Sequence, residues 1–220
     1  MQAGIPPVEI PSPLGDIPGI VARFLCRISP IDTCCERSVA MDRLKSSHLS
    51  ILQDQGLGLF PLVTAEQVHG RKVSLITQPS DHPLPDVDGL LTIRRGITLG
   101  IYVADCAPVW LVARDGSAGA LLHSGKKGTE LAIMKEGLGA LIALTGKPAE
   151  EFLAVIGPCI RPPCYEVDFA REIADQASDA GIREIHDAGI CTACHPDRYY
   201  SYRKEMGMTG RMLATLTLLP

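Results

Sequence analysis

Between residues 59 and 123 the chain consists almost entirely of short apolar runs separated by glycine, proline and aspartate. The runs are FPLVT, KVSLIT, DGLLTI, ITLGIYVA, APVWLVA and AGALLH. Runs of this length, rich in β-branched residues and bounded by turn-forming residues, are typical of β-strands. Because each strand must bury at least one face, we expect the chain to fold around packed β-sheets.

Helical patterns flank this β-rich region on both sides. The clearest one follows Gly128 and ends near Gly146, with apolar residues at helical spacing: Leu131, Met134, Leu138, Leu141 and Ile142. Two further helices are predicted, at residues 36–55 and 168–180. Three further strands are predicted, at residues 19–25, 152–157 and 212–218. The order of elements predicts an α+β fold, a single domain over residues 1–220 with mixed β-sheets flanked by helices.

Composition narrows the classes of partner. The chain has 220 residues, 46% of them hydrophobic and 21% charged, which is typical of a globular domain. The net charge is −4 and no basic run stands out, so we do not expect nucleic acid as a partner. The longest apolar stretch, residues 99–113, contains Asp105 and is too short to cross about 30 Å of hydrocarbon, so no membrane association is expected.

The N-terminal residues and the cysteines indicate a cytoplasmic protein. The first twenty residues contain five prolines, no basic residue and no continuous apolar core, unlike a signal peptide. A disulfide framework is typical of short secreted chains, and this chain is longer. Its eight cysteines are therefore expected to be reduced thiols or metal ligands.

Three candidate metal ligands stand at the ends of apolar runs, each next to small or turn-forming residues. They are His69 in QVHG, Cys106 in ADCAP and His123 in LHSG. Two imidazoles and a thiolate suit zinc, and three protein ligands leave a fourth position open for water or a substrate. Taken singly, each residue is more often an ordinary buried thiol or a structural histidine.

Seven segments, in order along the chain, resemble the motif series of the laccase-domain, or multicopper polyphenol oxidase, family. They are AEQVHG (65–70), DVDGLLT (86–92), VADCAPV (103–109), HSGKKG (123–128), IGPCI (156–160), CYEV (164–167) and YYSYRKEMGMTGRM (199–212). Several motifs in one order are far more specific than any single one. We interpret residues 59–220 as the family-like part with the metal site and residues 1–58 as a divergent N-terminal part.

The resemblance implies a metal, a fold and an activity. It makes His69, Cys106 and His123 the ligands of one zinc ion, with copper possible in its place because copper outcompetes zinc for nitrogen and sulfur donors. It implies an α/β sandwich similar to that of cysteine hydrolases. The implied activity is phosphorolysis of purine nucleosides, with adenosine deamination as a second reaction. Adenosine or inosine and phosphate are then the partners, and the chain is a monomer or a small homo-oligomer.

The resemblance also implies roles for residues around the metal. Asp88 and Asp105 are candidate proton carriers. Four cationic side chains are candidates to hold phosphate, if they are not solvated surface charges: Lys126, Lys127, Arg203 and Arg211. Tyr165 and Glu166 match CYEV and are expected to line the substrate pocket, unless Glu166 only pairs locally.

Two departures from the family pattern concern the substrate. The family usually has His-Ala-Gly-Trp-Arg-Gly where residues 123–128 read HSGKKG. Lys126 and Lys127 thus replace a planar ring and a guanidinium, and an ammonium group neither stacks nor binds an oxyanion in two places. A Gly-Gly-Val-Ser segment is expected after the first strand, but residues 23–29 read RFLCRIS. We therefore expect the substrate pocket to differ in part, and the preferred nucleoside stays open.

Three alternatives use the same residues. A metal-independent cysteine hydrolase would have Cys106 as nucleophile and His123 or His69 as its base. Asp105 or Asp88 would then orient that base. A multicopper polyphenol oxidase needs several coppers held largely by His-x-His pairs, whereas this chain has six histidines and no such pair. A structural zinc in a binding module would need a fourth protein ligand, and none stands near the three in sequence.

Residues 191–195 spell Cys-Thr-Ala-Cys-His, the pattern of covalent haem attachment. Attachment of haem c normally follows export, which the N-terminus does not indicate, so this interpretation is disfavoured. The same residues could form a second metal site with Cys159 or Cys164. Otherwise they form a turn with ordinary thiols.

Overall fold

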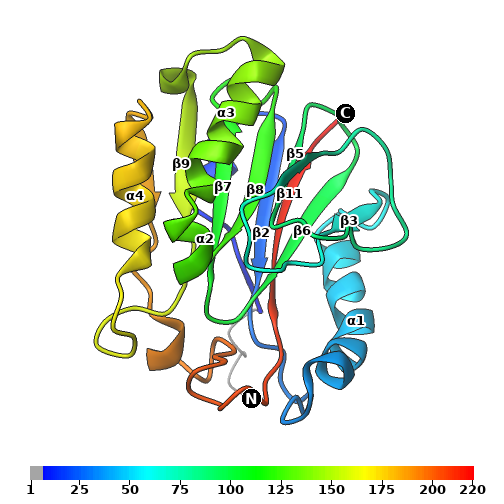
Figure 1. The fold of residues 1–220 in the computed structure, drawn as a ribbon. Coiled ribbons are helices and arrows are strands. Elements are labelled where there is room, and N and C mark those ends of the chain that lie inside the picture. Colours follow the sequence, from blue (N-terminus) through cyan, green and yellow to red (C-terminus); the bar gives the residue numbers. More distant parts are fainter. Residues whose placement is uncertain (1–6) are drawn as a thin grey trace.

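A computed structural model describes residues 7–220 and stacks two β-sheets face to face between helices (Figure 1). The first sheet has the strand order β1-β2-β11-β6-β3. Its strands are β1 (Val8–Glu9), β2 (Ile20–Leu25), β3 (Leu62–Thr64), β6 (Thr98–Val103) and β11 (Met212–Leu218). The C-terminal strand β11 lies at its centre, antiparallel to both β2 and β6. This sheet therefore joins the two ends of the described chain.

The second sheet has the strand order β10-β9-β7-β8-β5-β4. Its strands are β4 (Val73–Leu75), β5 (Gly89–Thr92), β7 (Ala107–Ala113), β8 (Gly119–Ser124), β9 (Phe152–Ile156) and β10 (Glu184–Asp187). The pairs β4–β5 and β9–β10 are parallel and the remaining pairs are antiparallel. Both sheets are mixed, as the sequence predicts.

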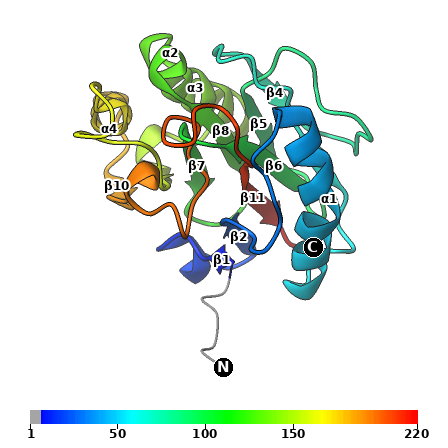
Figure 2. The ribbon, with the colours of Figure 1, turned by 90° about the horizontal axis from the view of Figure 1, so that it is seen from below.

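In the described part of the chain, four α-helices cover the outer faces of the two sheets (Figure 2). On the six-stranded sheet lie α2 (Lys126–Glu130), α3 (Ile133–Thr145) and α4 (Phe169–Asp179). On the five-stranded sheet lies α1 (Arg37–Asp54), whose Leu52 packs against Leu25 and Leu213. Three short 3-10 helices complete the fold, at Leu14–Asp16, Ala149–Glu151 and Thr192–Cys194. Within residues 7–220, no helix is long and apolar enough to cross a bilayer.

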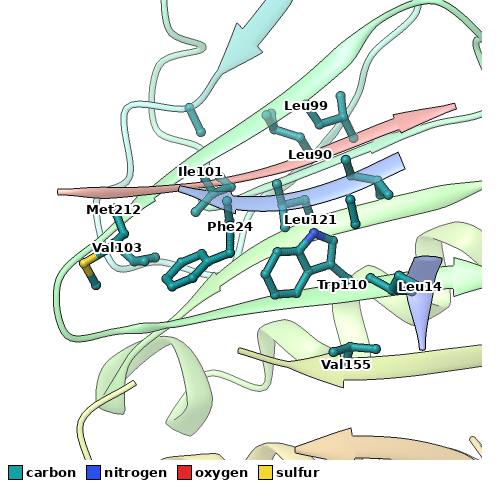
Figure 3. Packing of buried hydrophobic residues seen from close by; sticks show 14 of the residues in the cluster. Leu14, Phe24, Leu90, Leu99, Ile101, Val103, Trp110, Leu121, Val155 and Met212 are labelled. Carbon is teal, nitrogen blue, oxygen red and sulfur yellow. The ribbon is translucent and has the colours of Figure 1, made fainter. Parts of the chain in front are cut away.

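The main hydrophobic core lies between the two sheets (Figure 3). Strand β7 shows why: its side chains alternate, so that Trp110 points toward the other sheet and Leu111 toward the helices. Both are fully buried, which explains the unbroken apolar sequence of this strand. The indole Nε1 of Trp110 donates a hydrogen bond to the Thr215 carbonyl oxygen at 3.0 Å and so links the two sheets.

The predicted strands and helices are confirmed, with small shifts at their ends. The predicted helix after Gly128 is wrong in one respect, because it is two helices. Ala132 adopts a left-handed conformation (φ 58°) and separates α2 from α3. Leu131, predicted on the buried face, is consequently 38% exposed. The edge strands β1 and β10, which have four residues or fewer, were not predicted from the sequence.

Candidate active site

The site lies where the chain passes from one sheet to the other. Strand β6 of the five-stranded sheet ends at Val103 and strand β7 of the six-stranded sheet begins at Ala107, so Cys106 lies in the crossing. Strand β7 pairs antiparallel with β8, with Ala107 opposite Ser124. The same register brings Cys106 against Gly125, where a Cβ atom would overlap the Cys106 sulfur. Glycine at 125 therefore leaves the space that the thiol occupies.

The pairing of β5 with β8 brings Asp88 beside His123. Gly89 lies opposite Leu122, and the His123 backbone N–H donates to the Asp88 carbonyl oxygen at 2.7 Å. The Asp88 Oδ1 atom also lies 2.8 Å from Nδ1 of His123. This contact leaves Nε2 of His123 as the ring nitrogen that can face a metal or a substrate.

The loop between β3 and β4 wraps around the same carboxylate and presents His69. Three consecutive backbone N–H groups donate to Asp88: those of Val68 at 3.2 Å, His69 at 2.9 Å and Gly70 at 2.7 Å. His69 has a positive φ of 60°, which is uncommon for a residue with a side chain. Asp88 has no exposed surface, so it acts as an internal anchor for both histidines.

Side-chain donor atoms of His69, Cys106 and His123 all lie within 4.8 Å of one another. The two imidazole rings meet edge to face, with centroids 4.9 Å apart. A tetrahedral zinc ion at about 2.0–2.3 Å from each donor needs the donors roughly 3.3–3.6 Å apart. The three donor atoms lie close enough together to share one ion, and the donor types are those that zinc prefers. The three residues therefore fit a single metal ion with an open coordination position.

Electrostatics favour the thiolate form of Cys106. Burial alone would raise the pKa of the thiol, but the charge of His123 and hydrogen bonds from both histidines outweigh it and lower the pKa to about 6. Burial alone would lower the pKa of His123, but the Cys106 thiolate and the Asp88 carboxylate outweigh it and raise the pKa to about 9. Near neutral pH the metal-free site therefore holds a thiolate–imidazolium pair.

A cavity of about 880 Å³ opens above this cluster. This volume lies within the range of small-molecule sites, which is roughly 300–1,000 Å³. His69, Cys106 and His123 form part of its wall, together with the aromatic rings of Tyr165 and Tyr202. The cavity thus combines nitrogen and sulfur donors with flat apolar surfaces.

Most of the predicted substrate residues reach the cavity. Four of them line it: Lys126, Arg203, Arg211 and Tyr165. Burial, and next the charge of the neighbouring Arg37, lower the pKa of Arg211. Arg37 and Arg211 both line the cavity. The guanidinium of Arg203 lies 5.4 Å from the centre of the Tyr165 ring, at cation–π distance.

Three of the predicted residues are outside the cavity wall: Asp88, Lys127 and Glu166. Asp88 lies behind the histidines and is fully buried. Lys127 lies in the first turn of α2, and its side chain is exposed. Glu166 pairs with Arg203 at 3.6 Å. Of its two predicted roles, lining the pocket or pairing locally, the structure shows local pairing.

Asp105 lines the cavity next to Cys106 and is 7% exposed. Its Oδ1 atom accepts a hydrogen bond from the Thr192 hydroxyl at 2.6 Å, and Oδ2 accepts one from the Arg203 backbone N–H at 2.8 Å. Each oxygen has a further lone pair. Asp105 therefore joins three separate parts of the chain at the cavity and can still accept a hydrogen bond.

Several cavity residues were not found from the sequence. Gln67 donates to the Tyr102 carbonyl oxygen at 2.6 Å and accepts from the Tyr102 N–H at 2.9 Å, which fastens the His69 loop to β6. Its place in the motif AEQVHG was the available signal. Arg37 at the start of α1 had no comparable signal, since it lies in the part interpreted as divergent. Residues 1–58 thus contribute directly to the site.

A comparison with family models matches residues 42–177 and 167–219 to the model described as "Multi-copper polyphenol oxidoreductase laccase". The match begins at residue 42, ahead of the first motif at residues 65–70. It includes all of the site residues predicted from the sequence.

Curated and solved relatives agree with this match. The protein named purine nucleoside phosphorylase ORF3 of Streptomyces griseus is 30% identical over 186 residues, which is 71% of this chain and 74% of that protein. The crystal structure of YfiH from Bacillus licheniformis has a TM-score of 0.86 at 21% identity and covers 98% of this chain and 97% of its own. That of YlmD from Geobacillus stearothermophilus has a TM-score of 0.84 at 23% identity and covers 93% of each chain. The two crystal structures establish the likeness in fold.

Proposed function

This chain belongs to the multi-copper polyphenol oxidoreductase laccase family, and on that premise we propose that it is a zinc-dependent purine nucleoside phosphorylase. The observation that carries the proposal is the convergence of His69, Cys106 and His123 at a cavity whose wall also holds cationic and aromatic side chains. The relative from Streptomyces griseus is named for this activity.

The proposed ligands are the two imidazoles and the Cys106 thiolate. Zinc bound there would supply Lewis acidity at the floor of the cavity. Asp88 holds Nδ1 of His123 and three N–H groups of the His69 loop, so it fixes the direction of both rings. We infer that Asp88 is a positioning residue rather than a proton carrier, because no part of it reaches the cavity.

The remaining cavity residues suit the two substrates. Phosphate carries charge that a guanidinium binds in two places, and Arg203 and Arg211 both line the cavity. A purine is flat, and Tyr165 offers a ring against which it can stack. Phosphorolysis requires an anion close to C1′ of the ribose, so holding both substrates side by side accounts for part of the rate. Lys126 adds a third cation without bidentate geometry.

In this proposal Asp105 accepts a proton from the hydrogen phosphate and passes it to the leaving purine, which regenerates the carboxylate. It lies in the wall beside Cys106, and each oxygen retains an acceptor position. Deamination of adenosine is the proposed second reaction, and there the same residue would carry a proton from the attacking water to the departing ammonia. Which reaction dominates depends on whether phosphate or water enters the cavity.

The test is an assay of inosine and adenosine, with and without phosphate, on protein of measured metal content. We expect free base and ribose 1-phosphate to form from inosine only when phosphate is present. Ammonia release from adenosine reports the second reaction. The variants His69→Ala, Cys106→Ala and His123→Ala should each lose zinc and nucleoside turnover and keep the far-UV circular dichroism of the parent.

Matched controls remove the same residue types elsewhere. His82→Ala and Cys34→Ala change exposed residues outside the cavity and should keep zinc and activity. The proposal is wrong if zinc-loaded protein turns over no purine nucleoside. It is also wrong if any one of the three site variants keeps full zinc and full activity.

A metal-independent cysteine hydrolase is the second candidate, because the site also has the order thiolate, imidazole, carboxylate. Cys106 would be the nucleophile, His123 its base and Asp88 the group that orients the base. Such an enzyme would work after chelation and be inactivated by one equivalent of thiol alkylator. Loss of activity on chelation, with recovery on adding zinc, would favour the phosphorylase; recovery with copper would identify copper as an alternative ion. We expect either enzyme to act in the cytoplasm, where Cys106 stays reduced.

A further inference from the structure

A second group of sulfur atoms lies outside the cavity. The thiols of Cys164, Cys191 and Cys194 all lie within 4.8 Å of one another, and the Cys164 and Cys194 sulfurs are 3.3 Å apart. None of the three lines the cavity. Cys194 is exposed and Cys164 is partly exposed, so the group is open to solvent on one side. The sequence singled out this region, and the nucleoside reaction does not use it.

The backbone brings the thiols together from two separate segments. Cys191 is the N-cap of the 3-10 helix Thr192–Cys194, and Cys194 is its last residue. The Cys194 N–H donates to the Cys191 carbonyl oxygen at 3.2 Å. Cys164 lies in the loop after β9, in a turn where its N–H donates to the Arg161 carbonyl oxygen at 2.9 Å. A β-bridge between Cys159 and Cys191 joins the two segments. The convergence therefore depends on ordered backbone.

The Cys191 thiol is held in place by the segment that carries Cys164. It donates a hydrogen bond to the Arg161 carbonyl oxygen at 3.8 Å, and the same carbonyl accepts from the Cys164 N–H. The guanidinium of the neighbouring Arg161 is already paired with Asp187 and leaves the sulfurs free.

We propose that Cys164, Cys191 and Cys194 bind one zinc ion, separate from the ion at the active site. Zinc at about 2.3 Å from three sulfurs needs them roughly 3.8 Å apart, and the observed spacing brackets this value. Thiolates select zinc and other soft cations over magnesium or calcium. The three thiols leave a fourth position open on the exposed side, so the proposed ion differs from a closed four-ligand structural zinc. Cys159 is not a ligand, because its thiol lies outside the group.

The proposed ion would brace one wall of the cavity. Cys164 directly precedes Tyr165, whose ring lines the cavity. Thr192, between the other two ligands, donates its hydroxyl hydrogen bond to Asp105. One zinc ion would therefore tie the Tyr165 loop to the segment that supports Asp105.

Zinc stoichiometry of the full-length, reduced protein tests the proposal. Metal-free protein is titrated with zinc chloride against a chromogenic chelator, and we expect two zinc ions per chain. Cys106→Ser should keep one ion, in the three-thiol group, and the double variant Cys164→Ser/Cys194→Ser should keep one, at the active site. Cobalt(II) is then bound in place of zinc. The thiolate charge-transfer absorption should be stronger in the Cys106→Ser protein, where three sulfurs bind the ion, than in Cys164→Ser/Cys194→Ser, where only the Cys106 sulfur does.

The matched control is Cys34→Ser/Cys35→Ser, which also removes two thiols but leaves the group intact. It should bind two zinc ions per chain. The proposal is overturned if the Cys106→Ser protein binds no zinc, or if Cys164→Ser/Cys194→Ser binds as many zinc ions as the parent protein. Because the Cys106→Ser protein isolates the three-thiol site, this result is independent of whether the chain acts on nucleosides.

Alkylation of the parent protein gives a second readout that needs no variant. Iodoacetamide followed by peptide mass spectrometry measures the rate of modification at Cys194 and, as an internal reference, at the exposed Cys34. Zinc should slow modification of Cys194 at least tenfold and leave Cys34 unchanged. Equal rates with and without zinc at Cys194 would refute the site.

Discussion

Replacing Asp88 by asparagine tests how the site is organised. Asp88 accepts four hydrogen bonds: Oδ1 from the His69 N–H and from Nδ1 of His123, and Oδ2 from the N–H groups of Val68 and Gly70. Asparagine is nearly the same size but offers one oxygen and one NH₂ group. Whichever way the amide turns, its NH₂ group faces two donors, and both lose their acceptor.

The size of the effect follows from this count. A buried donor left without an acceptor costs about 1–3 kcal/mol, so two such donors reduce the free energy of unfolding by about 2–6 kcal/mol. His123 can relieve one clash by moving its proton from Nδ1 to Nε2. That tautomer removes the Nε2 lone pair from the metal position, and zinc affinity should fall roughly 10–100-fold.

Two measurements on Asp88→Asn check these values. Urea unfolding of the metal-free protein gives the free energy of unfolding, and competition with a chelator gives the zinc affinity. Asp86→Asn is the matched control, because it makes the same chemical change at an exposed position. If Asp88→Asn matches the control in both stability and zinc affinity, Asp88 does not anchor the histidines and our account of the site is wrong.

Four further predictions concern other parts of the molecule. Gly125→Ala should reduce zinc binding, since its Cβ would overlap the Cys106 sulfur, and chelator competition measures this. In metal-free protein, the rate of Cys106 alkylation should rise with pH around a midpoint near the thiol pKa of about 6, and a midpoint near the ordinary thiol value would contradict the thiolate–imidazolium pair. Arg203→Gln should raise the KM for phosphate more than the KM for nucleoside in steady-state kinetics, with Lys127→Gln as the exposed control. Burial lowers the pKa of His48 to about 4, so between this value and the unfolded value of about 6.5 only the unfolded chain binds the proton. The stability that neutral His48 contributes is therefore complete above about pH 7.5, and about 2 kcal/mol of it is lost as the pH falls to about 5. Within residues 7–220 neither ring nitrogen of His48 has a hydrogen-bond partner. His48→Leu should therefore raise the free energy of unfolding, measured in urea, at about pH 7.5 and at about pH 5, and should abolish the difference in stability that His48 causes between these two pH values.

Local sequence patterns were sufficient for most elements of the fold. The alternation and unbroken apolar runs identified β6 through β9, because a strand buried on both faces excludes polar residues. Helical spacing identified α3 and α4 in the same way. Helical spacing did not reveal the break at Ala132, because alanine is an ordinary helix residue and gives no sign of a left-handed backbone.

The division of the strands between two sheets was not predictable from such patterns. Strands β6 and β7 are neighbours in sequence and look alike, yet they belong to different sheets. Partner choice depends on contacts between residues far apart in the chain, such as β11 inserting between β2 and β6. Only the packed structure records those contacts.

The same distinction applies to the site. The nitrogen and sulfur donors were evident from the sequence, because His69, Cys106 and His123 supply them whatever the fold. The tertiary structure alone decided that these donors meet within 4.8 Å, that Asp88 lies behind them and that Arg37 reaches the cavity. The physical reason is strand register: pairing β5 and β7 with β8 sets which residues face one another, and one step of slippage would turn each side chain to the opposite face.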